Sequence, residues 1–464
     1  MPSTASSASL YCQERQIAIA AVTAAARICE TIRRTNNQMV DTIKSESPPS
    51  SIPNHQTTTS LNAASAATAA TTATTSTMIK DDTSPVTIAD YASQAIICRA
   101  LSIAFPNDIV IAEEDSTQLL RHNGQQLREV AKYVQMSCNN EQSSEGATTA
   151  TTIAEKDVIN WIDHGSSNAN ANTDGAIIDH DEEAESSSSR RGSKKPKTAQ
   201  KRFWTLDPID GTKGFIRGDQ YAIALALIDN NEVKVGILAC PALKLPLDVL
   251  NDQNDDDDVV CPSASTGNGV LFVAVRGEGT TMESLGNVQG NKTSPVQKQH
   301  QTQSIRLGQE NGTTSADSSS TTRSIPRRMV ESYVSTHCNQ SLQENIAKAV
   351  GITTKSLRMD SQAKYGIVAS GYATLYLRMP NPNKSTYKEC IWDHAAGSIV
   401  VEEAGGYVTD MNGKRLDFTK GHKLFENTGV IVSNNGGGNV DNEKNIHDKV
   451  LEALKRHERQ ESQS

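Results

Sequence analysis

The spacing of apolar residues predicts three helices. Between 14 and 34, apolar side chains recur every three or four residues, which places them on one face of a helix. A second helical run follows Thr87 and ends before Pro106, because a threonine with Asp90 three positions later is typical of a capping box. A third helix is expected over 393–403, where the glycine pair that follows would end it.

Continuous or alternating apolar runs predict short strands at 108–112, 203–206, 221–228, 233–239, 270–276 and 407–409. The sequence Asp-Asn-Asn-Glu at 229–232 separates two of these runs and is typical of a tight hairpin. Strands and helices are mixed without strict alternation of strand and helix. The pattern therefore predicts an α+β protein, with layers of mixed sheet between layers of helix, rather than a doubly wound parallel sheet.

Four polar tracts interrupt these elements, at 45–77, 138–200, 251–265 and 281–324. They are rich in Ser, Thr, Asn, Gln or Asp and contain few large apolar side chains, so they bury too little surface to offset the entropy of ordering. We expect them to be disordered surface insertions. The remaining chain, about 309 residues, is enough for one enzyme of two lobes.

Charge and composition exclude several classes of protein. With 45 Lys+Arg against 54 Asp+Glu the net charge is −9, which argues against a dedicated nucleic-acid binder. The basic cluster at 190–197 leaves a nuclear signal or an RNA-binding patch open. No run approaches the roughly 18 apolar residues of a membrane helix. The eight cysteines are scattered without a Cys-x-x-Cys pair. We expect a cytoplasmic monomer that binds neither nucleic acid nor membrane, with organellar targeting left open.

The sharpest local signal for chemistry is the segment Asp-Pro-Ile-Asp-Gly-Thr that begins at Asp207. Pro208 restricts the backbone and Gly211 permits a tight reversal, so Asp207, Asp210 and the carbonyl of Ile209 can point into one small volume. Two carboxylates held this close raise each other's pKa unless a cation lies between them, and such oxygen ligands suit Mg²⁺. The alternative is an ordinary turn whose acids are solvated.

Three further acidic sites lie at the ends of expected elements. Glu113 follows the strand at 108–112, Asp393 begins the third helix, and Asp90 lies at the start of the second. Each also has a structural interpretation: a polar loop for Glu113, a helix N-cap for Asp393, and the acidic partner of a capping box for Asp90. Four acidic sites at strand ends and helix starts together favour one shared cluster.

Taken in order, these segments resemble the lithium-sensitive, metal-dependent phosphatase superfamily, which contains inositol monophosphatase, inositol polyphosphate 1-phosphatase and fructose-1,6-bisphosphatase. The matching segments are Lys80-Asp-Asp-x-Ser-Pro-Val-Thr-x-x-Asp90, Glu113-Glu114, Asp207-Pro-Ile-Asp-Gly-Thr212 and Trp392-Asp-His-x-x-Gly397. The resemblance implies a sugar-phosphatase-like fold. Its lobes would be an N-terminal metal-binding lobe at 1–250 and a C-terminal substrate-binding lobe at 266–464.

A further stretch selects a branch of that superfamily. Met359-Asp-Ser-Gln-Ala-Lys-Tyr-Gly366, with Tyr376-Leu-Arg378 downstream and a histidine upstream, is similar to the 3′(2′),5′-bisphosphate nucleotidases. The resemblance implies hydrolysis of the 3′-phosphate of 3′-phosphoadenosine 5′-phosphate, a reaction of sulfur metabolism, to AMP and phosphate. A substrate with a second phosphate needs a cationic clamp, which Lys364 and Arg378 would supply. The substrate-binding residues implied in this way are Thr212, His337, Ser361, Lys364, Arg378 and Asp393.

The same resemblance implies roles at the acidic sites. Two or three Mg²⁺ ions would be held by Glu113, Asp207, the Ile209 carbonyl, Asp210 and Asp393, and Li⁺ would inhibit. Asp90 and Thr212 would be the catalytic residues that orient the attacking water and accept its proton. The helix after Asp393, with the amide of Gly397, would offer N–H groups to the phosphate.

Two other functions stay open. An inositol polyphosphate 1-phosphatase or inositol monophosphatase would share the metal motifs but act on a different phosphate ester. A catalytically silent protein that binds the nucleotide as a sensor would keep the binding residues without turnover.

Overall fold

The computed structural model describes most of the chain outside the polar tracts. The described residues are 10–45, 77–79, 85–121, 124–145, 152–171, 202–244, 269–286, 303–305, 327–333, 338–381, 387–434 and 445–462. No helix among them is long and apolar enough to cross a membrane.

A seven-stranded sheet forms the centre of the molecule. Its strands, in spatial order, are β3 (Ile109–Ala112), β4 (Arg202–Asp210), β5 (Ala222–Asp229), β6 (Glu232–Cys240), β7 (Val270–Val275), β8 (Gly279–Ser284) and β9 (Gln303–Ile305). The β3–β4 pair is parallel, and every other pair is antiparallel. The parallel pairing places Glu113, which follows β3, beside Asp207, which lies near the C-terminal end of β4.

A smaller, five-stranded mixed sheet lies apart from the first. Its spatial order is β11 (Leu357–Arg358), β10 (Met329–Glu331), β12 (Leu375–Arg378), β14 (Val430–Ser433) and β13 (Tyr407–Thr409). Strand β10 is parallel to both of its neighbours, whereas the pairs of β14 are antiparallel. A short antiparallel pair, β1 (Thr77–Ile79) with β2 (Pro85–Thr87), precedes the helix that carries Asp90.

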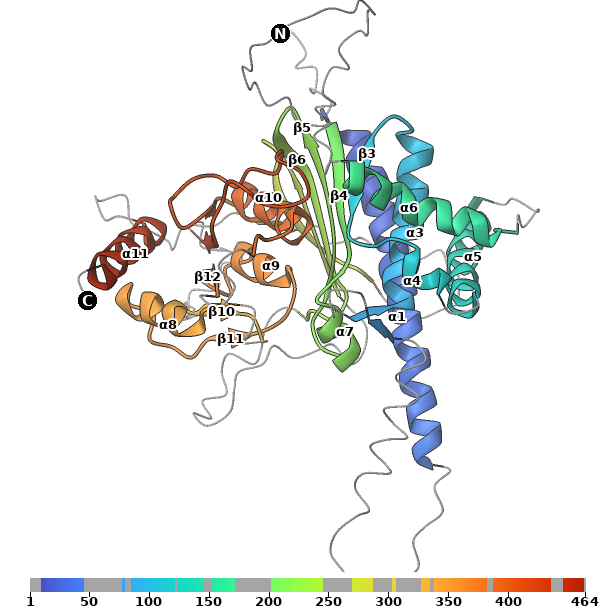
Figure 1. The fold of residues 1–464 in the computed structure, drawn as a ribbon, viewed down its shortest axis with the longest axis horizontal. Coiled ribbons are helices and arrows are strands. Elements are labelled where there is room, and N and C mark those ends of the chain that lie inside the picture. Colours follow the sequence, from blue (N-terminus) through green and yellow to red (C-terminus); the bar gives the residue numbers. More distant parts are fainter. Residues whose placement is uncertain are drawn as a thin grey trace, which may run out of the picture.

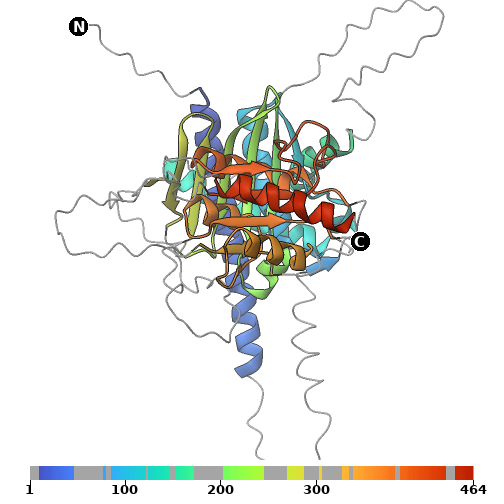
Figure 2. The same cartoon turned by 90° about the vertical axis from the view of Figure 1, so that its left-hand side faces the viewer.

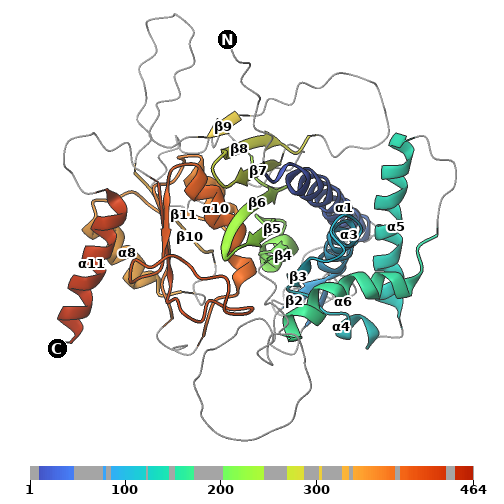
Figure 3. The same cartoon turned by 90° about the horizontal axis from the view of Figure 1, so that it is seen from above.

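Helices separate and cover the two sheets, as Figures 1 and 3 show. One layer covers the outer face of the large sheet, and it consists of α1 (Cys12–Ser45), α3 (Ile88–Ala104), α5 (Gln125–Glu145) and α6 (Glu155–Ala171), with the short α4 (Thr117–Leu120) beside it. Between the sheets lie α9 (Ala363–Ala369) and α10 (Ala395–Glu403). The outer layer consists of α8 (Gln340–Ala349) and α11 (Ile446–Glu461), and Figure 2 shows α11 across the small sheet.

The strands of the large sheet are apolar on both sides because both sides are covered. Along β5, Ile223 and Leu225 face the cluster built with α1 and α3, whereas Ala224 and Ala226 face the cluster built with α9 and α10. The small side chains on the second face let α10 approach closely. A side chain at Gly236 of β6 would lie 2.2 Å from Ile399 of α10. This approach fixes α10, and the residues just before it, over the large sheet.

Several predictions are confirmed. The layered α+β architecture is present, α3 begins at a capping box of Thr87 with Asp90, and strands occupy every expected run. The β5–β6 hairpin turns through Asn230 and Asn231, whose φ angles of 52° and 64° suit the tight turn expected there. The glycine pair ends α10 as expected, and β13 follows it.

The expectation of a disordered tract at 138–200 is wrong for part of its length. Helix α5 runs on to Glu145, and α6 occupies Glu155–Ala171. Val158 and Ile162, four residues apart, are buried against the core that contains α3. The polar composition of the whole tract conceals this short apolar face, because composition averages over residues that alternate on a helix surface.

Two further boundaries need correction. The first expected helix, at 14–34, is part of the longer α1, which ends at Ser45. The lobe boundary expected between 250 and 266 falls inside the large sheet, because β7 pairs with β6 along its length. The tract at 281–324 likewise overlaps β8 and contains β9, which add the last two strands to that sheet. The tract at 251–265 lies outside the described residues.

Candidate functional site

The segment that begins at Asp207 ends strand β4 and starts a sharp turn. Strand β4 continues to Asp210 rather than ending at 206, because its pairing with β5 resumes after a shift of register between Asp207 and Asp210. Gly211 follows with φ 86°, a conformation that residues other than glycine rarely adopt. The short helix α7 (Thr212–Arg217) begins directly afterwards. Asp207 is buried, so the alternative of a turn with solvated acids is wrong for this residue.

Four carboxylates from three separate segments meet at this turn. Burial raises the pKa of Asp207 well above its usual value, and the nearby carboxylates of Glu113, Asp210 and Asp393 raise it further. Asp207 and Glu113 also share a hydrogen bond. Burial likewise raises the pKa of Asp393, with Asp210 among the acids that add to the effect. Raised pKa values of this kind mark anions that are held together without enough positive charge nearby.

Asp393 lies in a one-turn 3₁₀ helix, η5 (Ile391–Asp393), and not in α10 itself. The N-cap position of α10 belongs to His394, which makes no side-chain cap. The N-cap interpretation of Asp393 is therefore wrong, and its side chain lines the cavity described below. The expectation that the Gly397 amide is free for a phosphate is also wrong, because this N–H donates to Gln362 Oε1 at 3.0 Å. Gly397 instead gives room to the ring of Tyr365, which a side chain there would meet at 2.4 Å.

Asp90 takes part in the capping box of α3 and also reaches the turn where a catalytic role was expected. Its Oδ2 accepts hydrogen bonds from the backbone N–H (2.8 Å) and the hydroxyl (2.6 Å) of Thr87, which completes the capping box of α3. Its Oδ1 lies 3.3 Å from the hydroxyl of Thr212. That hydroxyl is also 3.2 Å from the carbonyl oxygen of Ile209. One oxygen of Asp90 therefore fixes a helix start, while the other faces the turn that carries Asp210.

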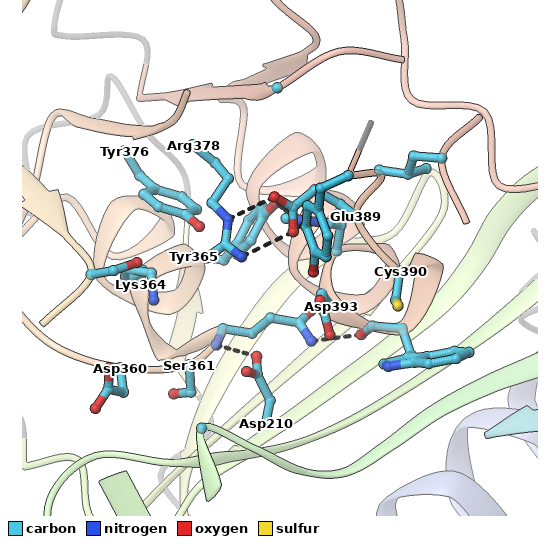
Figure 4. A pocket seen from close by; sticks show the side chains of 18 of the residues that line it. Asp210, Asp360, Ser361, Lys364, Tyr365, Tyr376, Arg378, Glu389, Cys390 and Asp393 are labelled. Carbon is cyan, nitrogen blue, oxygen red and sulfur yellow. Dashed lines mark hydrogen bonds and ion pairs between the residues drawn. The ribbon is translucent and has the colours of Figure 1, made fainter. Parts of the chain in front are cut away.

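A cavity of about 480 Å³ opens beside the four carboxylates. Glu113, Asp210 and Asp393 line it on one side, and Figure 4 shows Asp393 and Asp210 below the pair formed by Arg378 and Glu389. Thr212 also lines the cavity, whereas Asp90, which is fully buried, does not. Glu113, Asp210, Thr212, Ser361, Lys364, Arg378 and Asp393, all singled out in the sequence, thus border one space.

The stretch that begins at Met359 supplies a further part of the cavity wall, next to the turn that carries Asp210. Ser361 lines the cavity with φ 70°, an uncommon value for a residue with a side chain. It lies against the turn of the carboxylates, since a side chain at Gly211 would be 3.1 Å from Ser361 Cβ. Arg217 of α7 forms an ion pair with Asp360, which joins the same two turns a second time.

Two cations expected to bind a phosphate also line the cavity, and both already have partners. Lys364 is buried, lies over the ring of Tyr376 and donates to the Met359 carbonyl at 3.4 Å. Burial lowers its pKa, although Asp210 and Asp360 oppose that effect. Arg378, at the end of β12, donates from Nε and Nη2 to the two carboxylate oxygens of Glu389 at 2.9 and 3.0 Å.

Glu389, Asp393 and His394 form a tighter group, whose potential ligand atoms lie within 4.8 Å of one another. Its need for a cation is smaller than that of the four carboxylates, because Arg378 already neutralises Glu389. Burial alone would raise the pKa of Glu389, but the guanidinium and His394 lower it to about 2. The negative charge that lacks a cation nearby is therefore concentrated at the carboxylates around Asp207.

The sequence analysis missed three residues that build the site: Gln362, Glu389 and His394. Gln362 lay within the matched stretch, and His394 within another, but neither had a role there. Glu389, four residues before Asp393, carries only the weak signal of an acid near a motif. His337 and the segment from Lys80 to Ser84 lie outside the described residues.

Comparison with known proteins gives a consistent family. Residues 116–459 match the model of the inositol monophosphatase family. The 3′(2′),5′-bisphosphate nucleotidase of Schizosaccharomyces pombe is 38% identical over 376 residues, which is 81% of this chain and 85% of the relative. The nucleotidase of the same name from Oryza sativa is 37% identical over 360 residues, 76% and 82% of the two chains. That from Emericella nidulans is 35% identical over 381 residues, 82% and 90%.

Proposed function

Because the chain belongs to the inositol monophosphatase family, we propose that it is a metal-dependent 3′(2′),5′-bisphosphate nucleotidase. Its reaction would be hydrolysis of the 3′-phosphate of 3′-phosphoadenosine 5′-phosphate, which gives AMP and inorganic phosphate. Relatives of that name are 35–38% identical over most of their length. The single observation that carries the proposal is one cavity lined both by carboxylates and by the cationic side chains of Lys364 and Arg378.

The buried carboxylates fit a site for divalent cations. Their pKa values are raised by burial and by one another, so folding leaves a negative charge that a cation would neutralise. The donors are all oxygens, as Mg²⁺ prefers. The residues that would hold two or three ions are Glu113, Asp207, the carbonyl of Ile209, Asp210 and Asp393. Mg²⁺ bound there supplies Lewis-acid charge for the phosphate and lowers the pKa of water; Li⁺ would compete for the same position.

Thr212 and Asp90 are the groups that would orient the attacking water and take its proton. Thr212 reaches the cavity, and Asp90 lies behind it at 3.3 Å. A water bonded to the Thr212 hydroxyl would therefore reach Asp90 through that hydroxyl rather than directly. The capping bonds from Thr87 keep Asp90 in place, so its second carboxylate oxygen stays directed at the Thr212 hydroxyl.

The phosphate that is not cleaved would lie against Ser361, Lys364 and Arg378, which line the cavity. Two cationic side chains in the same cavity as the acids would favour a substrate with two phosphates over one with a single phosphate. His337 remains a candidate for the same subsite. Asp393 and Thr212, which also line the cavity, would contact the phosphate that is cleaved.

The proposal is tested by phosphate release from 3′-phosphoadenosine 5′-phosphate, with and without Mg²⁺ and Li⁺. We expect release to require Mg²⁺, to be inhibited by Li⁺, and to exceed release from inositol 1,4-bisphosphate in kcat/KM. Asp210→Asn and Asp90→Asn should each lower kcat by about 10²-fold or more. Asp115→Asn is the matched control, because Asp115 is exposed and caps only Thr117. Equal turnover of the two substrates, or turnover by Asp210→Asn, would contradict the proposal.

A further inference from the structure

The Arg378 guanidinium is held in one orientation by a carboxylate of its own chain. Glu389 accepts from Nε and Nη2 of Arg378, which is the two-point geometry that fixes the plane of a guanidinium. Both side chains are largely buried, at 15% and 13% exposure, so water contributes little to holding them. A guanidinium carries five N–H donors, and these two bonds use only two of them. The remaining donors belong to a side chain that lines the cavity.

Glu389 is itself fixed from its other side. His394 Nε2 lies 3.7 Å from Glu389 Oε2, and His394 Nδ1 is 2.7 Å from the hydroxyl of Tyr365. His394 is 2% exposed, and its Nε2 has no hydrogen-bond partner among the described residues. Burial and the bond to Tyr365 therefore hold the imidazole with Nε2 towards Glu389. Tyr365, His394, Glu389 and Arg378 therefore form one polar row along the wall of the cavity. Figure 4 shows Tyr365, Glu389 and Arg378 of this row.

From this row we infer that Glu389 is a positioning residue that orients Arg378 and thereby sets the preference for substrates with a second phosphate. The inference rests on the proposed function for the identity of the substrate. Glu389 lines the cavity too, but both of its carboxylate oxygens accept from Arg378, so it would act on the substrate through the guanidinium. It would reduce the freedom that a long side chain loses when it binds a phosphate, which improves affinity without a new contact.

Glu389 could also have the opposite effect and weaken the binding of the phosphate. Glu389 is an anion next to a phosphate-binding cation, so its charge alone would weaken phosphate binding. Replacing it with an uncharged residue would then tighten binding if charge dominated, and weaken binding if orientation dominated. We expect orientation to dominate, because the two-point contact would be lost and the guanidinium would stay buried.

The test compares Glu389→Gln with the wild type in kinetics and in binding. With 3′-phosphoadenosine 5′-phosphate we expect KM to rise about tenfold with a much smaller change in kcat, and with 3′-AMP, which lacks the 5′-phosphate, little change in either. Calorimetry should show AMP binding weakened about tenfold and adenosine binding unchanged. Glu389→Asp, which keeps the charge at a shorter reach, should recover part of the loss. Unchanged or tighter AMP binding by Glu389→Gln would overturn the inference.

A matched control separates this role from a general loss of ion pairs. Glu331 is similarly buried and binds Arg358 at 3.1 Å, but it does not line the cavity. Glu331→Gln should therefore leave the ratio of the two substrates unchanged. The binding measurement also separates the inference from the proposed function. If the wild type binds AMP, Glu389→Gln weakens that binding and nothing is hydrolysed, the proposed function is refuted and the inference stands. If the wild type does not bind AMP, the inference is refuted as well.

Discussion

Gln362 connects three segments of the site through a single residue. Its backbone N–H donates to Asp210 Oδ2 at 2.6 Å. Its side-chain Nε2 donates to the carbonyl of Trp392 at 2.8 Å, and its Oε1 accepts from the amide of Gly397. Trp392 directly precedes Asp393. The backbone of Gln362 therefore holds one proposed metal ligand, Asp210, and its side-chain amide holds the segment that carries another, Asp393.

Gln362→Ala should weaken the response to Mg²⁺ more than it weakens the fold. The substitution leaves the Trp392 carbonyl and the Gly397 amide without their partner, at a cost of about 1–3 kcal/mol each. Because Asp393 would then be less well oriented, we expect the Mg²⁺ concentration for half-maximal activity to rise about 10-fold or more. Gln343→Ala is the control, since Gln343 is fully buried and binds the Leu377 carbonyl away from the carboxylates. A Mg²⁺ response equally affected by both variants would contradict this role.

The site residues that could be predicted from the sequence are those whose role depends on residues close to them in the chain. Asp207 and Asp210 stand out because Pro208 and Gly211 shape the turn between them, and Asp90 stands out because Thr87 is three residues away. Gln362 and Glu389 could not be identified in this way. The bonds of Gln362 reach 30 to 152 residues along the chain, so they follow from packing and not from local pattern.

Helices and strands could be predicted where residues at their ends have a recognisable capping or turn pattern. Helix α3 has its capping box, and the β5–β6 hairpin has asparagines that tolerate positive φ. Strand β4 was expected to end at 206, because Asp-Pro is typical of a turn; pairing with β5 carries it on to Asp210. The membership of β7 to β9 in the large sheet was not predictable, because strand order is decided by long-range contacts and not by any single run.

A buried histidine attaches α11 to the small sheet, and it should make the stability of the fold sensitive to acid. His447, in the first turn of α11, is buried, and its ring nitrogens lie 2.9 Å from the Ser433 hydroxyl and 2.8 Å from the Thr409 hydroxyl. Burial lowers the pKa of His447 to about 4, although Asp448 opposes this. His447 therefore binds a proton more readily in the unfolded chain than in the folded one. As the pH falls from about 6.5 to about 4, this protonation favours the unfolded state and lowers the stability of the fold.

The free energy of unfolding should accordingly fall by up to about 3 kcal/mol across this pH interval through His447 alone. Urea unfolding of the wild type and of His447→Gln, at several pH values from 7.5 to 4, measures the effect. We expect the difference in stability between the two proteins to shrink as the pH falls, because the glutamine does not titrate. His457→Gln, later on the same helix, should keep the wild-type slope. Parallel slopes for the wild type and His447→Gln would refute the assignment.

In the whole molecule, the site lies where the two sheets meet through a shared layer of helices. The carboxylates come from the edge of the large sheet and from η5, whereas Ser361, Lys364 and Arg378 come from α9 and the small sheet with their adjoining turns. The sequence predicted such a convergence from acids at strand ends. It could not locate the boundary between the two sheets, because polar tracts interrupt the chain within a sheet as well as between sheets.

The clustered acids predict that divalent cations stabilise the whole fold, and more so at higher pH. Asp207 and Asp393 have raised pKa values in the folded state, so without a cation their contribution to stability is lost as pH rises above the usual range of carboxylates. A cation that binds only the folded chain adds about 2.7 kcal/mol at one hundred times its Kd, or about 5 °C in Tm. Thermal unfolding at pH 6 and 8, with MgCl₂ or with NaCl at equal ionic strength, should show this gain for MgCl₂ alone, larger at pH 8. Asp210→Asn should raise the Tm in NaCl and lose most of the Mg²⁺ gain, whereas Asp115→Asn should change neither. Equal gains from both salts would mean that screening, and not a bound ion, accounts for the stabilisation.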